Sequence, residues 1–233
     1  MDTMIDTAAK LHGTMRETWP AERPIPALAG EAEVGRPTGG LAELVEGIVA
    51  SRTEPIKTIV EVGGELGGST RFFLRQFPDA QVITIDPWPA NYRHISKKWP
   101  QIATHAEADG LSYYRVFMSL NWEWRDRLLP LRATSGEGLP QLFAMGLKPD
   151  LIYIDGMHTF HGCYDDLTLA FHLFPGATIA GDDWEFNPGL EHHQFMGYLL
   201  PVRRAVTEFA FAHGRLEVRT AGNCYFIEAP ATA

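Results

Sequence analysis

Short apolar segments alternate with segments of helical character along most of this 233-residue chain. The segments 57–63 (KTIVEVG), 81–86 (QVITID) and 150–155 (DLIYID) are rich in apolar and β-branched residues, which is typical of buried strands. In residues 41–49 the apolar side chains fall at helical spacing. Strands that alternate with helices in this way predict a mainly parallel sheet covered by helices on both faces.

The expected strands and the segments between them predict the order of the whole fold. Seven strands are expected, over residues 57–63, 81–86, 128–134, 150–155, 177–181, 215–219 and 223–228. The last two follow a long helix over 195–211 directly, so we expect them to be antiparallel to each other. The expected fold is therefore α/β, Rossmann-like and doubly wound, with a mainly parallel seven-stranded sheet and an antiparallel final strand.

Two segments lie outside this alternation. Residues 1–36 are punctuated by prolines and form an N-terminal extension, for which we expect helical pieces without a long periodic pattern. Residues 87–109 interrupt the strands and helices with prolines and aromatic residues, so we interpret them as an insertion that acts as a lid. The main domain then covers residues 37–233.

Composition sets limits on the class of protein. Hydrophobic residues make up 45% and charged residues 21%, as in an ordinary globular domain, and the net charge of -9 argues against nucleic acid or an anionic membrane as partner. The two cysteines, Cys163 and Cys224, form no CxxC pair, which disfavours a disulfide framework or a zinc site. Without a secretory signal or an apolar run of ~20 residues, we expect a soluble, cytoplasmic protein; a homo-oligomer stays open.

A glycine-rich segment joins the first expected strand to the following helix. It reads EVGGELGGS over residues 61–69. Glycines permit positive φ and a close approach of a ligand, and the helix N-terminus offers free N–H groups. Such a turn by itself serves equally well to pack a helix on a strand. Asp86, however, ends the next strand, where an acid can accept hydrogen bonds from ribose hydroxyls, and together the two features predict a nucleotide-type cofactor.

Three acids end two later strands of the expected sheet. Asp155 follows the strand 150–155, and Asp182 and Asp183 follow the strand 177–181. The carboxyl ends of parallel strands share one edge, which also carries the glycine segment. A single Asp at such a position often only caps the next helix. Three converging carboxylates repel one another unless they are protonated or bind a cation, so they favour a divalent metal such as Mg²⁺.

These motifs resemble those of class I S-adenosylmethionine-dependent methyltransferases. The E-x-G-x-x-x-G-x-S pattern of residues 61–69 resembles their motif I, and the acids resemble the metal site of catechol-methyltransferase-like O-methyltransferases. Residues 155–170 (DGMHTFHGCYDDLTLA) are similar to the D-G-x-H-x-Y/F-x-x-x-x-D signature of a bacterial branch, some members of which modify sugars and antibiotics. The resemblance covers about residues 57–185 and implies S-adenosyl-L-methionine as cofactor.

The resemblance implies that the cofactor lies against Glu61, Gly63, Gly67, Ser69, Asp86, Trp88 and Ser135. Gly63, Gly67 and Ser69 would line its methionine part. Glu61 would orient the loop or the ammonium group, and Asp86 would bind the ribose. Trp88 and Ser135 would lie at the adenine. For Trp88, a place in the core is an equally good interpretation.

The resemblance also implies that Asp155, Asp182 and Asp183 hold Mg²⁺ or another divalent cation, with Asp155 part of the catalytic group. In the catechol enzymes a lysine three residues after the first Asp takes the hydroxyl proton, and here that position is His158. We expect His158 to be the general base, because a neutral histidine with an ordinary pKa of about 6.5 suits this role. The alternatives are that it only hydrogen-bonds an aspartate, or that His161 takes the proton.

The expected function is divalent-metal-assisted transfer of a methyl group from S-adenosyl-L-methionine to a hydroxyl of a small polar acceptor. The aromatic segments beside the expected pocket favour a sugar or glycoside, of which a methylated mannoside is one candidate. An NAD-dependent oxidoreductase would share the strand–glycine–helix–strand–Asp layout but leaves the three acids unexplained. A non-catalytic methyltransferase-like module would have no use for these acids together with His158.

Overall fold

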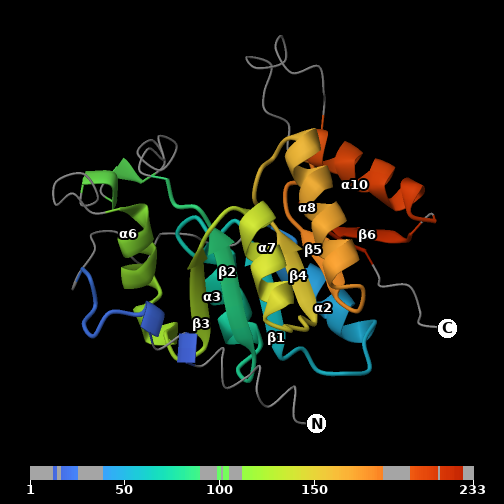
Figure 1. Ribbon diagram of the computed structural model, residues 1–233. Helices are drawn as coiled ribbons and strands as arrows, with labels where there is room; N and C mark the ends of the chain where they lie inside the picture. Colours follow the sequence, from blue (N-terminus) through green and yellow to red (C-terminus); the bar gives the residue numbers. More distant parts are fainter. Residues whose placement is uncertain are drawn as a thin grey trace.

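The computed structural model of this chain describes residues 13–14, 17–25, 39–89, 99–100, 102–104, 112–185, 200–214 and 216–227. Its strands are β1 (Thr58–Val62), β2 (Gln81–Asp86), β3 (Leu128–Arg132), β4 (Leu151–Ile154), β5 (Thr178–Gly181), β6 (Val218–Ala221) and β7 (Cys224–Ile227). They form one seven-stranded sheet in the order β3-β2-β1-β4-β5-β7-β6 (Figure 1). β1 to β5 are parallel, and β7 is antiparallel to both β5 and β6. The expected sheet, with its antiparallel end, is confirmed.

The helices cover both faces of the sheet. They include α2 (Leu41–Ala50), α3 (Gly68–Gln76), α6 (Tyr113–Leu120), α7 (Ser135–Ala144), α8 (Phe160–Leu173) and α10 (Pro201–Ala212). Because successive side chains of a strand point to opposite faces, Ile59 packs under α2, α3 and α6, whereas Val60 packs under α7, α8 and α10 (Figure 1). The result is a core on each side of the sheet. None of the described helices is long and apolar enough to cross a membrane.

Some helix boundaries differ from the expected ones. The aromatic-rich segment 113–127 predicts a helix, but α6 ends at Leu120, because the buried side chain of Asn121 donates to the carbonyl of Phe117 at 2.7 Å and so competes with the helical pattern. A short 3-10 helix, η2 (Trp122–Trp124), follows. The sequence also predicts a helix over 164–174, and α8 begins earlier, at Phe160, since Thr159 caps it by accepting from the Gly162 N–H at 3.1 Å.

The described part of the N-terminal extension packs onto the main domain. Trp19 is buried, and its Nε1 donates to the carbonyl of Leu128 in the edge strand β3 at 2.8 Å. Ile25 is also buried, and its N–H donates to Ser119 Oγ of α6 at 2.9 Å. Helical backbone is seen at 13–14 and 17–18. Residues 17–25 are therefore part of the same core, while most of 1–36 lies outside the described residues.

Most of the expected insertion at 87–109 also lies outside the described residues. The side chains of Trp88 and Ile102, near its two ends, are fully buried in the core on the α3 and α6 side, and Trp99 packs partly against it. The ends of the segment are thus anchored in the core. A lid function for the remainder stays a prediction.

Candidate functional site

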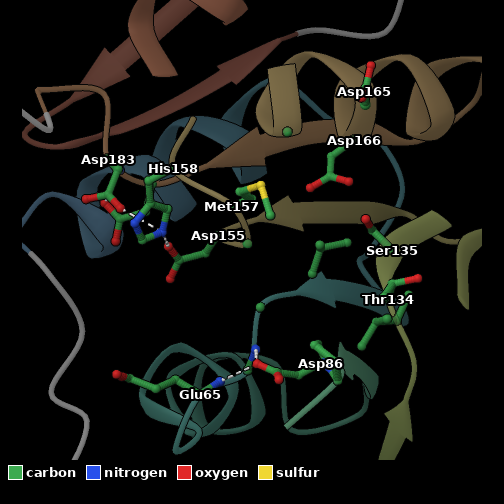
Figure 2. A pocket seen from close by; sticks show the side chains of 18 of the residues that line it. Glu65, Asp86, Thr134, Ser135, Asp155, Met157, His158, Asp165, Asp166 and Asp183 are labelled. Atoms are coloured by element: carbon green, nitrogen blue, oxygen red, sulfur yellow. Dashed lines mark hydrogen bonds and ion pairs between the residues drawn. The ribbon is translucent and has the colours of Figure 1, made fainter. Parts of the chain in front are cut away.

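The carboxyl ends of β1, β2, β4 and β5 border one cavity of ≈ 1410 Å³ (Figure 2). Its wall includes the glycine segment, the ends of β2 and β4, the start of α7, one side of α8, and the acids after β5. Pockets for one small ligand usually measure ~300–1,000 Å³. The larger volume here suits two ligands side by side, such as a cofactor and an acceptor.

Two glycines of the segment have a positive φ together with a close neighbour. Gly63 has φ +90, and a Cβ there would lie 2.0 Å from the carbonyl oxygen of Asp155, so its absence lets β1 and β4 approach each other. Gly67 has φ +83, and a Cβ would lie 2.4 Å from the side chain of Asn121. Gly63 lines the cavity, together with Gly68 and Ser69, whereas Gly67 does not. The expected cofactor contact of Gly67 is thus replaced by a packing role.

Glu61 is fully buried below this segment and does not line the cavity. Its carboxylate accepts hydrogen bonds from the hydroxyls of Ser69, Thr70 and Thr84, the last at 2.8 Å. Burial raises the pKa of Glu61 above its usual value, although the three hydroxyl donors act against this rise. Of the two roles expected for Glu61, orienting the loop fits this position, because it ties the start of α3 to β1 and β2.

Asp86, at the end of the neighbouring strand β2, holds the backbone of the glycine segment by hydrogen bonds (Figure 2). Its Oδ2 accepts from the N–H groups of Gly64 and Glu65, both at 3.0 Å, and its Oδ1 accepts from the Trp88 N–H at 2.7 Å. Asp86 is 4% exposed and lines the cavity. This loop-holding role was not expected from the sequence; it follows from the pairing of β1 with β2, which brings Asp86 beside the glycine segment.

Trp88 lies beneath the glycine segment instead of in the cavity wall. Its side chain is 0% exposed, and its ring packs against Phe117 and Tyr114 at centroid distances of 4.7 and 5.0 Å. Its Nε1 donates to the carbonyl of Glu65 at 2.8 Å. The neighbouring prolines at 87 and 89 line the cavity in its place. The expected contact of Trp88 with adenine does not fit this burial, and core packing is its role.

Ser135 lines the cavity at the first turn of α7, together with Thr134 and Gly136. Thr134 forms a capping box with Glu137, which fixes this turn. Asp166 of α8 lies opposite Ser135 and is also buried in the cavity wall (Figure 2). Burial raises the pKa of Asp166 to about 6, against the opposing effect of a hydrogen bond from Ser135. The sequence analysis did not single out Asp166; an acid on the inner face of an amphipathic helix was the available signal.

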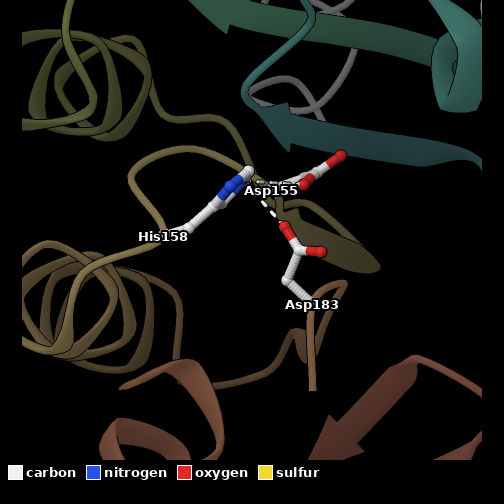
Figure 3. Close-up of side chains that lie close together, drawn as sticks. All are labelled: Asp155, His158 and Asp183. Atoms are coloured by element: carbon white, nitrogen blue, oxygen red, sulfur yellow. Dashed lines mark hydrogen bonds and ion pairs between the residues drawn. The ribbon is translucent and has the colours of Figure 1, made fainter. Parts of the chain in front are cut away.

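Asp155, His158 and Asp183 converge at the end of β4 and β5 (Figure 3). His158 Nε2 lies 3.3 Å from Asp155 Oδ1 and 3.0 Å from Asp183 Oδ2. One ligand atom from each of the three residues lies within 4.8 Å of the others, a spacing that could hold a metal ion. All three residues line the cavity. His161 is exposed on the next turn and does not line it.

Asp182 also lines the cavity but lies outside this group. Its Oδ1 accepts from the Asp183 N–H at 2.8 Å, from Asn223 Nδ2 at 3.2 Å and from Cys224 Sγ at 3.7 Å. These bonds hold the carboxylate against the turn between β6 and β7. All three expected ligands, Asp155, Asp182 and Asp183, thus line the cavity, but the group that converges at ligand spacing is Asp155, His158 and Asp183. The ligand set itself stays a prediction.

The pKa values of Asp155 and His158 are both shifted by their neighbours. Burial raises the pKa of Asp155 to about 7, helped by the charges of Asp182 and Asp183 and opposed by His158. Burial acts to lower the pKa of His158, but the hydrogen bonds and charges of Asp155 and Asp183 outweigh it and raise that pKa to about 10. With this pKa the imidazole of His158 carries a proton at pH 7, whereas the expected base role needs a neutral ring. That role stays a prediction.

Comparisons with known proteins agree with this arrangement. Residues 60–184, more than half of the chain, match the model of a family described as "Methyltransferase domain". No curated protein matches the chain. Similar solved structures include the O-methyltransferase TomG from Streptomyces achromogenes in complex with SAM, with a TM-score of 0.54, 15% identity, and coverage of 98% of this chain and 99% of that one.

Two further structures have the same fold. Cofactor-bound Rv0187 from MTB has a TM-score of 0.55 and 15% identity, with coverage of 88% of both chains. The O-methyltransferase from Bacillus cereus in complex with SAH has a TM-score of 0.50 and 16% identity, with coverage of 91% of this chain and 98% of that one. At such identities the similarity shows the fold alone.

Proposed function

This chain belongs to the methyltransferase domain family, and from that premise we propose that it is an S-adenosylmethionine-dependent O-methyltransferase assisted by a divalent cation. One observation carries the proposal: a single cavity joins the glycine segment and Asp86 to the group of Asp155, His158 and Asp183. The solved structures of the same fold that are O-methyltransferases with bound SAM or SAH support it. The alternative of an NAD-dependent oxidoreductase leaves the Asp155 group without a use.

The cavity fits the cofactor in the chemistry of its wall. The N–H groups at the start of α3, where Gly68 and Ser69 line the cavity, suit the methionine carboxylate. Asp86 places a charged acceptor at the end of β2, where ribose hydroxyls can donate to it. Ser135 offers a hydroxyl at the start of α7, on the side of the cavity assigned to adenine.

The Asp155 group fits a divalent cation such as Mg²⁺ because two carboxylates, the usual ligands of this ion, converge there. The pKa of Asp155 is raised because its carboxylate is buried and lies near the charges of Asp182 and Asp183. Protonated His158 compensates part of this negative charge. Asp155 and Asp183 would hold Mg²⁺ or another divalent cation. When bound, the cation lowers the pKa of the acceptor hydroxyl and fixes its oxygen.

His158 Nε2 is the atom that would take the hydroxyl proton. At a pKa of about 10 it already carries a proton at pH 7, so it can act as a base only if positive charge nearby lowers its pKa. A cation on Asp155 and Asp183 would supply that charge and also compete for the carboxylates that now stabilise the imidazolium. The base role of His158 and cation binding are therefore coupled in this proposal.

For the acceptor we propose a sugar or glycoside, with a methylated mannoside as one candidate product. The cavity wall carries carboxylates and hydroxyls, among them Glu65, Asp165 and Thr168, that can bond to several sugar hydroxyls. The volume leaves room for such a molecule beside the cofactor.

Calorimetric titration with S-adenosylhomocysteine and with NAD tests the cofactor. We expect S-adenosylhomocysteine to bind and NAD not to bind. Asp86→Ala should weaken S-adenosylhomocysteine binding by about 1.5–3 kcal/mol, the cost of a lost hydrogen bond to a charged group, whereas Asp79→Ala in an exposed turn should leave it unchanged. Binding of NAD in place of S-adenosylhomocysteine would favour the oxidoreductase.

A further inference from the structure

We propose that Asn223, in the turn between β6 and β7, is a positioning residue that fixes the carboxylate of Asp183 for cation binding and holds that of Asp182 beside it. The inference rests on the proposed function in one respect, that Asp183 serves a divalent cation. Asn223 lies forty residues beyond Asp183 in the chain, and no motif in the sequence connects the two.

The side-chain amide of Asn223 contacts both acids. Its Nδ2 donates to Asp182 Oδ1 at 3.2 Å and to Asp183 Oδ1 at 3.1 Å. The two carboxylates are adjacent in sequence and repel each other, and a shared N–H donor reduces that repulsion without adding charge. With its Oδ1 held by Asn223, Asp183 directs Oδ2 at His158 Nε2, 3.0 Å away. Asn223 therefore selects which oxygen of Asp183 faces the Asp155 group.

Asn223 also holds the backbone that carries the acids. Its Oδ1 accepts from the Glu185 N–H at 2.8 Å, and its carbonyl accepts from the Trp184 N–H at 2.8 Å. Asp183 lies in the turn that joins β5 to Trp184. Its φ is +63, a left-handed conformation that costs a non-glycine residue free energy. The bonds of Asn223 to the N–H groups of Trp184 and Glu185 help to hold Asp183 in this conformation.

The turn of Asn223 is itself fixed from the start of α2. The Asn223 N–H donates to the carbonyl of Gly39 at 3.2 Å. Gly40 has φ +103, and a Cβ there would lie 2.0 Å from the carbonyl oxygen of Ala221, so the two backbones are in direct contact. Because its backbone is held by these contacts, Asn223 can position the carboxylates that it touches. Residues that hydrogen-bond to metal ligands commonly act in this way.

The test is the affinity for Mn²⁺ alone, measured by the electron paramagnetic resonance signal of the free ion, without cofactor or acceptor. Asn223→Ala should bind Mn²⁺ roughly 10–100-fold more weakly than the wild type, the usual effect of losing a partner of a metal ligand. Its affinity for S-adenosylhomocysteine, measured by calorimetry, should not change. Thr220→Ala, at an exposed position of β6, is the matched control and should bind Mn²⁺ like the wild type.

Each other result overturns the proposal. Equal Mn²⁺ affinity in Asn223→Ala would remove Asn223 and leave the proposed function intact. Parallel loss of Mn²⁺ and S-adenosylhomocysteine affinity would make its role purely structural. If wild type binds S-adenosylhomocysteine but no divalent cation, both this inference and the cation assignment fail, while the methyltransferase assignment stands.

Should Asn223→Ala fail to fold, nuclear magnetic resonance of the wild-type side-chain amide decides. The Asn223 NH₂ signals should shift on addition of Mg²⁺ and stay in place on addition of S-adenosylhomocysteine, because only the acids that they contact change their charge environment. Asn223 NH₂ signals that do not shift at saturating Mg²⁺ would contradict the proposal.

Discussion

The imidazole of His158 lies between two carboxylates, and its proton determines what it can do. Desolvation disfavours the imidazolium, but Asp155 at 3.3 Å and Asp183 at 3.0 Å stabilise it more, and its pKa rises to about 10. A residue that is already protonated is a counter-charge and not a base. In the proposed function, His158 is therefore a counter-charge to the two carboxylates and would become a base only when a cation lowers its pKa.

His158→Ala should reduce turnover roughly 10²–10⁴-fold, the range for a lost general base, with unchanged affinity for S-adenosylhomocysteine. The matched control is His161→Ala, since His161 is exposed one turn further along α8. With Mg²⁺ bound, wild-type turnover should fall as the pH drops and His158 becomes protonated, and this acid limb should be absent from the variant. Steady-state rates across pH check both points, and near-normal turnover in the variant would exclude His158 from the mechanism.

Asp166 gives a pH dependence of stability that is independent of catalysis. Its folded-state pKa of about 6 exceeds the ordinary 3.8, chiefly because of burial, so the folded protein binds the proton more tightly than the unfolded chain. Stability from this group is complete below about pH 4 and is lost as the pH rises through 6.

Asp166→Asn should abolish that loss, so its stability relative to wild type should improve between pH 4 and pH 7 by up to about 3 kcal/mol, at 1.36 kcal/mol for each unit of pKa. Urea denaturation at the two pH values measures this difference. Glu46→Gln, at an exposed position of α2, should show no such change. A constant difference between wild type and Asp166→Asn at both pH values would contradict the raised pKa.

The candidate site could be predicted from sequence only where a residue type and a strand end coincide. Asp86, Asp155 and Asp183 were identified in this way, because parallel strands bring their carboxyl ends to one edge. The convergence of His158 with Asp155 and Asp183, while Asp182 is held apart, could not be predicted in this way, since it depends on which carboxylate Asn223 and Cys224 hold. The sequence left Trp88 open between cavity and core, because an aromatic residue after a strand can turn into either.

At the scale of elements, the strands were predicted more closely than the helices. Buried parallel strands are continuous apolar runs, and the expected ranges for β1 and β2 match the observed Thr58–Val62 and Gln81–Asp86 to within one residue. Helix ends depend on side-chain bonds such as those of Asn121 and Thr159, which periodicity does not contain. The docking of residues 17–25 on β3 was also missed, because nothing in the prolines of that segment indicates its partner.

Trp19 is the residue through which this N-terminal segment closes the β3 edge. Trp19→Ala should reduce the free energy of unfolding by about 3–5 kcal/mol, the range for loss of a large buried aromatic side chain, because both core contacts and the bond to Leu128 are lost. Glu17→Ala, at an exposed position of the same segment, should have little effect. Chemical denaturation measures both, and a loss below about 1 kcal/mol for Trp19→Ala would show that the segment contributes little to the fold.

At the scale of the whole molecule, one sheet edge gathers residues that are far apart in the sequence. The glycine segment, Asp86, the acids after β4 and β5, and the turn of Asn223 come from five different parts of the chain and meet around one cavity. The two cores on either side of the sheet hold this edge in place. The fold therefore accounts for the adjoining positions of the proposed cofactor site and the proposed cation site.

The most direct test of the proposed function is transfer of a labelled methyl group from S-adenosyl-L-methionine to a panel of sugars, glycosides and catechols, with Mg²⁺ and with excess chelator. The account predicts a labelled O-methyl product, with a sugar or glycoside as the preferred acceptor. Its formation should stop on chelation, return on addition of Mg²⁺, and leave the circular dichroism spectrum unchanged throughout. Full product formation in excess chelator, with metal analysis showing no bound cation, would contradict the cation site, and absence of both S-adenosylhomocysteine binding and methyl transfer would contradict the account as a whole.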